Sequence, residues 1–133
     1  MIVLDTHIWH WWINQIPGHL SDADKTLIEC ADVVAVSAIS CFEMAWLASH
    51  GRIDLDMSFE AWLNLVESAE IVRFLPVTPR IAAAAVALPE YHKDPQDRII
   101  IATALHHGAK LMSFDSQFPK YRELDGCLLK GGR

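Results

Sequence analysis

The chain has 133 residues, of which 52% are hydrophobic and 21% are charged, so it can bury a core and is not a disordered protein. No apolar run approaches the roughly 20 residues of a membrane-spanning helix, and the first residues lack the basic segment of a signal peptide, so we expect a cytoplasmic protein with no membrane contact. The formal net charge of -6 argues against a protein that simply coats nucleic-acid phosphates.

Short apolar runs alternate along the chain with longer segments of helical spacing. Strands are predicted at residues 2–4, 33–36, 72–75, 110–113 and 127–129. Helices are predicted at residues 21–31, 37–50, 58–69, 79–88 and 95–107. Strands that are separated by helices pair in parallel, so the sequence predicts an α/β fold, a three-layer sandwich with a mostly parallel central sheet of about five strands. No linker or repeat divides the chain, and residues 1–133 are therefore predicted to form a single domain.

Two acidic residues lie at the carboxyl ends of predicted strands. Asp5 follows the first apolar run, and Asp115 ends the stretch KLMSFD. Ligands of open α/β sheets bind outside these strand ends, so both carboxylates could face one crevice. Each could equally be a helix N-cap, because Asp often takes that role.

Glu43 lies within the apolar stripe of a predicted helix, since it shares a face with Ile39 and Leu47. Its alternative role is a capping box with Ser40, in which the carboxylate would bind the backbone. That alternative weakens if the helix begins at Ser37, because Glu43 then lies beyond the first turn.

Asp97 has the same ambiguity at the start of another predicted helix. Asp94 fits the N-cap and Pro95 the first helical position, with Asp97 in the first turn. Asp97 also shares a face with Ile100 and Ala104, so its carboxylate could point inward. The pattern alone allows both interpretations.

The sharper hypothesis is that four of these carboxylates converge in one pocket, namely those of Asp5, Glu43, Asp97 and Asp115. Four carboxylates repel one another unless a hard cation neutralises them, and oxygen ligands suit Mg²⁺ or Mn²⁺. Metal clusters of this kind activate water and stabilise the charge that develops when a phosphodiester is displaced.

Four stretches of the sequence resemble the motifs of a known family. IVLDTHIW, SAISCFEMAWL, HKDPQDRIIIATAL and LMSFDSQF resemble, in this order and over nearly the whole chain, the four acidic motifs of PIN-domain ribonucleases. The resemblance is greatest to the VapC-type toxins of bacterial toxin–antitoxin pairs.

The resemblance implies a metal-dependent endoribonuclease with RNA as its substrate, a small protein antitoxin as its partner, and a homodimer. Thr6 matches a polar position beside the metal ligands, and Asp94 belongs to a D-P-x-D-R variant of the third motif, in which Asp97 ranks above Asp94. The Mg²⁺ or Mn²⁺ ion would be held by four carboxylates, those of Asp5, Glu43, Asp97 and Asp115.

Two other classes of function are compatible with parts of the pattern. An aspartyl-phosphate phosphatase could use Asp5 as its nucleophile, but such enzymes resemble D-x-D and position 7 is a histidine. A non-catalytic protein-binding module could use all the acids as helix caps. A metal titration distinguishes this module from the nuclease, because caps show no dependence on Mg²⁺ or Mn²⁺.

The basic residues are concentrated near the C-terminus. Residues 1–92 have four Lys and Arg against twelve Asp and Glu, whereas residues 93–133 have seven against five. RNA requires local positive charge, so Arg98, Lys120 and Arg122 are candidates for the rim of the acidic pocket, although an ordinary solvated surface explains them equally well.

Aromatic side chains near the N-terminus are a second candidate contact surface. Trp9, Trp11 and Trp12 cannot all face one side of a helix, so at least one should point away from the core. We expect apolar side chains of the antitoxin to lie on one of the three.

Overall fold

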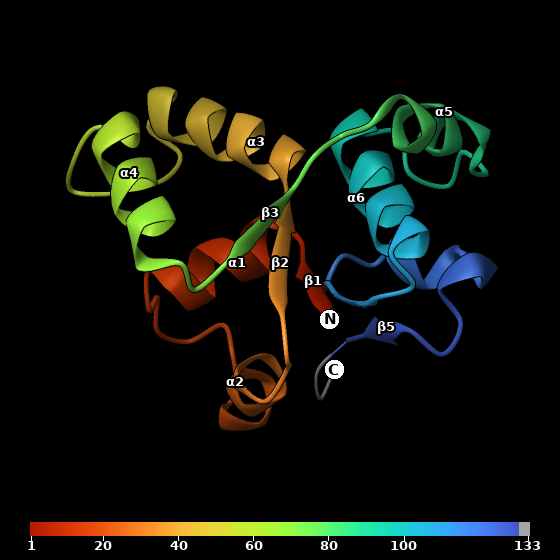
Figure 1. Cartoon of the computed structure of the whole chain (residues 1–133), viewed down its shortest axis with the longest axis horizontal. Helices are drawn as coiled ribbons and strands as arrows, with labels where there is room; N and C mark the ends of the chain where they lie inside the picture. The colour runs from red at the N-terminus through yellow and green to blue at the C-terminus, as the bar shows by residue number, and fades with distance from the viewer. Residues whose placement is uncertain (131–133) are drawn as a thin grey trace.

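The computed structural model describes residues 1–130. The last three residues of the predicted domain, 131–133, include Arg133 and lie outside the described residues. One sheet of five parallel strands forms in the described part, in the order β3-β2-β1-β4-β5 (Figure 1). The strands are β1 (Ile2–Leu4), β2 (Val34–Ser37), β3 (Arg73–Leu75), β4 (Lys110–Met112) and β5 (Leu128–Leu129). The strand prediction is confirmed to within one residue at each end.

Helices connect the strands and lie on both faces of the sheet. Within residues 1–130 they are α1 (Thr6–Ile13), α2 (Asp22–Glu29), α3 (Ala38–Ser49), α4 (Phe59–Ala69), α5 (Pro79–Ala87) and α6 (Pro95–His106), together with the 3-10 helices η1 (Phe118–Lys120) and η2 (Arg122–Leu124). The five predicted helices are confirmed, whereas α1 and the two 3-10 helices were not predicted.

Side chains of the central strands alternate between two apolar cores, as the pleat of a strand requires. Val3 faces a core with α5 and α6, and Leu4 faces a core with α1, α2, α3 and α4. In Figure 1, α1 and α4 lie to the left of the sheet and α5 and α6 to the right. These two cores confirm the predicted three-layer α/β sandwich.

Local capping explains where several helices begin. Ser21 and Asp24 form a reciprocal capping box at α2, in which each backbone N–H donates to the other side chain, at 2.9 and 3.0 Å. Asp94 caps α6 and Pro95 occupies its first turn. The start of α6, which carries Asp97, is therefore set by residues next to it in the sequence.

The described residues include no helix with the length and apolar character needed to cross a lipid bilayer.

Candidate functional site

The order of the strands places one crevice next to β1. The chain adds β2 and β3 on one side of β1 and β4 and β5 on the other, so the topology switches direction between β1 and β4. Ligand sites of open α/β sheets lie at such a point, beyond the carboxyl ends of the strands. Leu4 and Met112 are paired at this end, and Asp5 and Asp115 follow them in the chain.

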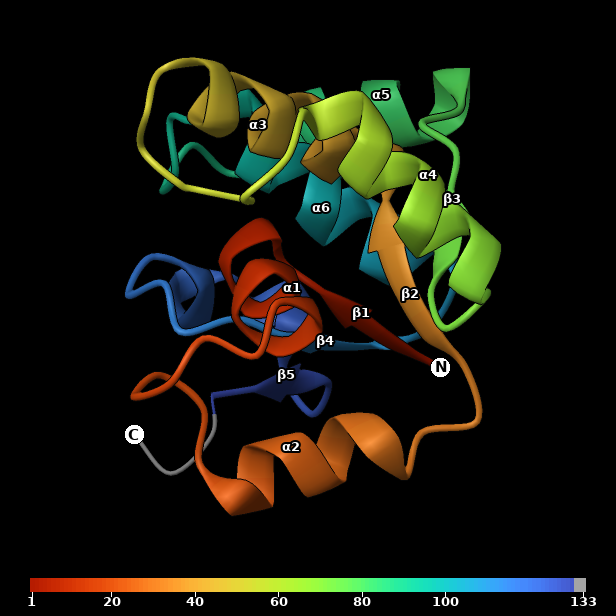
Figure 2. The same ribbon diagram turned by 90° about the vertical axis from the view of Figure 1, so that its left-hand side faces the viewer.

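A cavity of about 410 Å³ opens at this place. Helices α3 and α6 pack against each other and contribute one acidic residue each, while α1 begins directly at the end of β1 (Figure 2). The side chains that line the cavity include all four predicted ligands, Asp5, Glu43, Asp97 and Asp115, and also Asp94 and His92.

Asp5 combines the two roles that its sequence position allows. Its Oδ1 accepts a hydrogen bond from the backbone N–H of Ile8 at 2.9 Å, so it is the N-cap of α1. The same carboxyl lines the cavity and is only 6% exposed. Burial raises its pKa to about 6, although hydrogen bonds from Ser113 and Ile8 act in the opposite direction.

Glu43 is not part of a capping box. Helix α3 is capped by Ser37, whose Oγ accepts from the N–H of Ile39, so Glu43 lies beyond the first turn. The Thr6 hydroxyl donates to Glu43 Oε1 at 2.6 Å and lies 3.0 Å from the Ser40 hydroxyl. Thr6 therefore fixes one oxygen of the carboxylate, as expected for a polar residue that supports a ligand.

Asp94 and Asp97 divide the two roles that the sequence left open for Asp97. Asp94 Oδ1 accepts from the N–H of Gln96 at 2.9 Å and caps α6. The Asp97 side chain is 16% exposed and lines the cavity. Burial, and after it the negative charges of Asp94, Glu43, Asp5 and Asp115, together raise the pKa of Asp97 to about 8.

Asp115 is oriented by the backbone that follows it. Its Oδ1 accepts from the N–H of Gln117 at 2.8 Å, which leaves Oδ2 to face the cavity. Asp115 is thus held by a local hydrogen bond and lines the cavity, but unlike Asp5 it is not a helix N-cap, because Gln117 occupies that position at η1.

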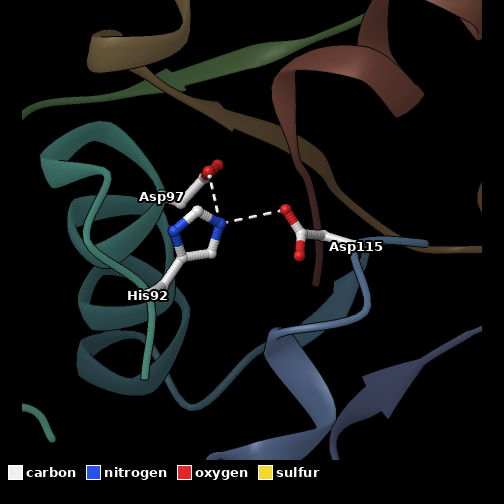
Figure 3. A group of neighbouring side chains, drawn as sticks. All are labelled: His92, Asp97 and Asp115. Carbon is white, nitrogen blue, oxygen red and sulfur yellow. Dashed lines mark hydrogen bonds and ion pairs between the residues drawn. The ribbon is translucent and has the colours of Figure 1, made fainter. Parts of the chain in front are cut away.

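His92 is a site residue that the sequence analysis did not identify. Its Nε2 lies 2.9 Å from Asp97 Oδ2 and 3.0 Å from Asp115 Oδ2, and Figure 3 shows both contacts at the same ring nitrogen. Within residues 1–130, His92, Asp97 and Asp115 are the group whose ligand atoms all lie within 4.8 Å of one another. Asp5 and Glu43 line the same cavity outside this tight group.

Comparison with known proteins identifies the family. The family model that matches residues 2–124 describes the PIN domain. The chain belongs to the PIN-domain family. It is 45% identical over 122 residues to Ribonuclease VapC22 from Mycobacterium tuberculosis, a match that covers 91% of this chain and 92% of that protein.

Solved structures of low sequence identity share the PIN-domain fold. A crystal structure of VapBC2 from Rickettsia felis bound to a promoter DNA fragment has a TM-score of 0.70 at 18% identity, and the match covers 97% of this chain and 98% of that one. A toxin–antitoxin complex from Klebsiella pneumoniae has a TM-score of 0.63 at 22% identity and covers 97% and 96%. FitAcB from Neisseria gonorrhoeae has a TM-score of 0.66 at 21% identity, with the same coverage.

Of the three basic residues predicted at the rim of this PIN domain's pocket, Arg98 has a different place. It is 9% exposed, and its guanidinium donates to backbone carbonyl oxygens at the end of α5 and in the following loop, those of Ala85, Val86, Leu88, Pro89 and His92. The rim prediction for Arg98 is wrong, because the charge of a residue does not reveal the direction of its side chain. Lys120 and Arg122 are exposed in η1 and η2.

The tryptophans of α1 also separate by burial. Trp9 is fully buried in the core, so it cannot form a contact surface for a partner. Trp11 and Trp12 are partly exposed and line a second cavity, of about 540 Å³, beside α2. Trp11 additionally lines the acidic cavity, where it is a neighbour of the four carboxylates.

The site as a whole concentrates negative charge in a small, partly buried volume. The repulsion between these carboxylates is unfavourable, and a bound cation or proton reduces it. The possible metal donors are the carboxylate oxygens that line the cavity, so hard divalent cations are the ions that it suits.

Proposed function

We propose that this PIN domain is a metal-dependent endoribonuclease that acts in the cytoplasm as the toxin of a type II toxin–antitoxin pair. The observation that carries the proposal is the convergence of four carboxylates from β1, α3, α6 and the β4 end on one cavity. The 45% identity to a protein named as a ribonuclease supports the reaction class.

The residues fit a divalent cation. Asp5, Glu43, Asp97 and Asp115 offer carboxylate oxygens, and the pKa of Asp97 is raised first by burial and then by like charges that a cation would neutralise. We propose Mg²⁺ as the natural ion, with Mn²⁺ as an alternative. When bound, the ion supplies Lewis-acid stabilisation of phosphodiester charge and lowers the pKa of water.

The side chains around the carboxylates contribute orientation. Thr6 holds Glu43 through its 2.6 Å hydrogen bond, and Gln117 holds Asp115 through its backbone N–H. Asp5 is fixed by its cap on α1. Each of these three carboxylates is thus held by at least one hydrogen bond from the protein while it lines the cavity, an arrangement that preorganises a metal site.

The partners follow from the resemblance to VapC-type toxins and from the surface. We propose a small protein antitoxin that blocks the cavity, and solved structures with this fold include toxin–antitoxin complexes. We also propose a homodimer. Phe42 (59% exposed) and Trp46 (44% exposed) of α3 offer the homodimer an apolar contact surface. In a monomer these two side chains would be in contact with solvent.

Cleavage of RNA by the purified protein tests the reaction. Wild type should cleave a panel of structured RNAs with Mg²⁺ or Mn²⁺ and not in chelator, while Asp115→Asn should lose at least about 100-fold in rate because a ligand charge is lost. The exposed Asp125 supplies the control, since Asp125→Asn should remain active.

Expression in bacteria tests the toxin role. Wild type should arrest growth, Asp115→Asn should not, and the small protein encoded beside the toxin should restore growth and co-purify with it. Full activity of Asp115→Asn would contradict the role of Asp115 as a ligand. Soluble wild type that neither cleaves RNA nor arrests growth would leave a protein-binding module as the better account.

A further inference from the structure

His92 contacts two of the proposed ligands at once. It lies in the loop between α5 and α6, two residues before the Asp94 cap. Its Nε2 is 2.9 Å from Asp97 Oδ2 and 3.0 Å from Asp115 Oδ2 (Figure 3). These two carboxylates come from different elements, α6 and the segment after β4, so His92 bridges them.

The second ring nitrogen determines what Nε2 can do. The backbone N–H of Asp94 donates to His92 Nδ1 at 3.2 Å. A backbone amide can only donate, so Nδ1 must be an unprotonated acceptor, and the proton of the neutral ring is then on Nε2. Nε2 therefore carries the hydrogen that is donated to Asp115 Oδ2, lies 2.9 Å from Asp97 Oδ2, and has no lone pair for a cation.

We propose that His92 is a positioning residue of the site, whose Nε2–H holds the Asp97 and Asp115 carboxylates in the orientation that binds the divalent cation. The inference rests on the proposed function, because it concerns the same cation. It assigns to His92 a role that is distinct from that of a ligand, since His92 acts on the cation through the two carboxylates.

The protein holds the histidine itself from three sides. The His92 backbone N–H donates to the Tyr121 hydroxyl at 2.9 Å, and the Arg98 guanidinium donates to the His92 carbonyl at 3.4 Å. The ring packs edge-on against Phe118, with 5.9 Å between centroids. Phe118 and Tyr121 are fully buried, so the loop is anchored to the core and the donor has a defined position.

Two other roles for His92 make different predictions. A nitrogen ligand would require the proton on Nδ1, which would break the bond from the Asp94 N–H. In the second role, His92 would merely compete with the cation for the two carboxylates. It would release them when the cation binds, and its substitution would then strengthen cation binding.

Cation affinity measured without RNA separates these roles. Calorimetric titration with Mg²⁺ and Mn²⁺ would compare wild type with His92→Phe, which keeps a ring and loses the donor, and with His92→Gln, which keeps an N–H. We expect His92→Phe to bind about 10–100-fold more weakly, as is usual when a group that orients a ligand is removed. His92→Gln should recover most of the affinity. His107→Phe is the matched control and should bind the cations like wild type, because His107 is an exposed histidine at the C-terminal end of α6.

The ring nitrogens provide a spectroscopic signature that a merely structural role would not produce. In ¹⁵N-labelled protein, NMR should show a protonated Nε2 and an unprotonated Nδ1, both in chelator and in saturating Mg²⁺. Tyr121→Phe removes the hydroxyl that accepts from the loop and keeps the buried ring. Tyr121→Phe should weaken cation binding by a smaller factor than His92→Phe does, and the protein should remain folded.

The outcomes distinguish this inference from the proposed function. If wild type binds neither ion, the metal site itself is wrong. If wild type binds and His92→Phe binds equally well or more tightly, the positioning role is wrong and the metal site stands. A proton on Nδ1 in the Mg²⁺ complex would also overturn the inference, because His92 would then be a ligand.

Discussion

Asp97 shows how a single carboxyl group can link folding to the proposed cation. Its pKa is raised to about 8 in the folded protein, first by burial and then by the neighbouring acids, against 3.8 for an ordinary Asp. The folded state therefore binds this proton more tightly than the unfolded state. Stability from this group is fully present below pH 3.8 and is lost as the pH rises through about 8.

Substitution of Asp97 by Asn should remove this pH dependence. In chelator, urea unfolding of wild type should show stability that falls between about pH 4 and pH 8, because deprotonation adds a charge to the acidic cavity. Asp97→Asn stays neutral, so its curve should be flatter and should lie at least about 1 kcal/mol above wild type near pH 8.

Mg²⁺ should reverse the order near pH 8, because it binds the wild-type carboxylate and stabilises that protein more than the variant. Asp125→Asn, at an exposed position, should follow wild type throughout. Parallel curves for wild type and Asp97→Asn would contradict the crowding of like charges in the cavity.

Helix α5 and the loop after it depend on a residue from the next helix. Arg98 donates five hydrogen bonds to carbonyl oxygens between Ala85 and His92, two of them at the C-terminal end of α5. The last carbonyls of a helix lack partners within it and favour a cation. Arg98 supplies both the hydrogen-bond donors and the positive charge, and it also anchors the loop that carries His92.

Arg98→Lys should therefore be destabilising although it keeps the charge. An ammonium group cannot reproduce the planar fork, and buried carbonyl oxygens would lose their donors. We expect a loss of about 2–4 kcal/mol, or a Tm lower by roughly 10 °C. Arg122→Lys, at an exposed position of η2, should melt like wild type. An unchanged Tm for Arg98→Lys would mean that these hydrogen bonds of Arg98 contribute little to stability.

Elements whose starts are set by neighbours in the sequence could be predicted well. The Ser21–Asp24 capping box and the Asp94 cap both form within three residues of the helix they begin. Helix α1 was missed because Thr6–Ile13 is apolar or aromatic on nearly every side, which hides the period of a helix. Its cap, Asp5, was recognised as a candidate without the helix that it begins.

The site was predictable to the extent that it lies at element ends. Asp5 and Asp115 follow strands, and parallel strands bring their carboxyl ends together. His92 lies in a loop, where no periodicity marks a residue, and its position depends on Tyr121, 29 residues later. The same limit applies to Arg98, whose burial follows from the α5–α6 packing and leaves no signal in the local sequence.

At the scale of the molecule, an acidic protein must bind a polyanion beside an acidic cavity. The net charge of -6 opposes the approach of RNA, and the oxygen-rich cavity adds to this repulsion. Positive charge near the site must therefore come from particular side chains. With Arg98 committed to backbone carbonyls, Lys120 and Arg122 are the remaining candidates from the sequence, in the two 3-10 helices that follow Asp115.

The dependence of RNA binding on salt should identify these residues. Each phosphate neutralised by a cationic side chain releases a counterion, so removing one contact to single-stranded RNA lowers the slope of log K against log salt by about 0.7. In an Asp115→Asn background, which keeps the RNA intact, Arg122→Gln and Lys120→Gln should each weaken binding and reduce this slope. Mg²⁺ affinity measured in the wild-type background should be nearly unchanged by either substitution. Arg80→Gln, an exposed arginine of α5, is the matched control for a loss of net charge alone. If all three variants have the same slope of log K against log salt, the RNA responds only to the net charge of the protein, and its phosphates bind elsewhere on the surface.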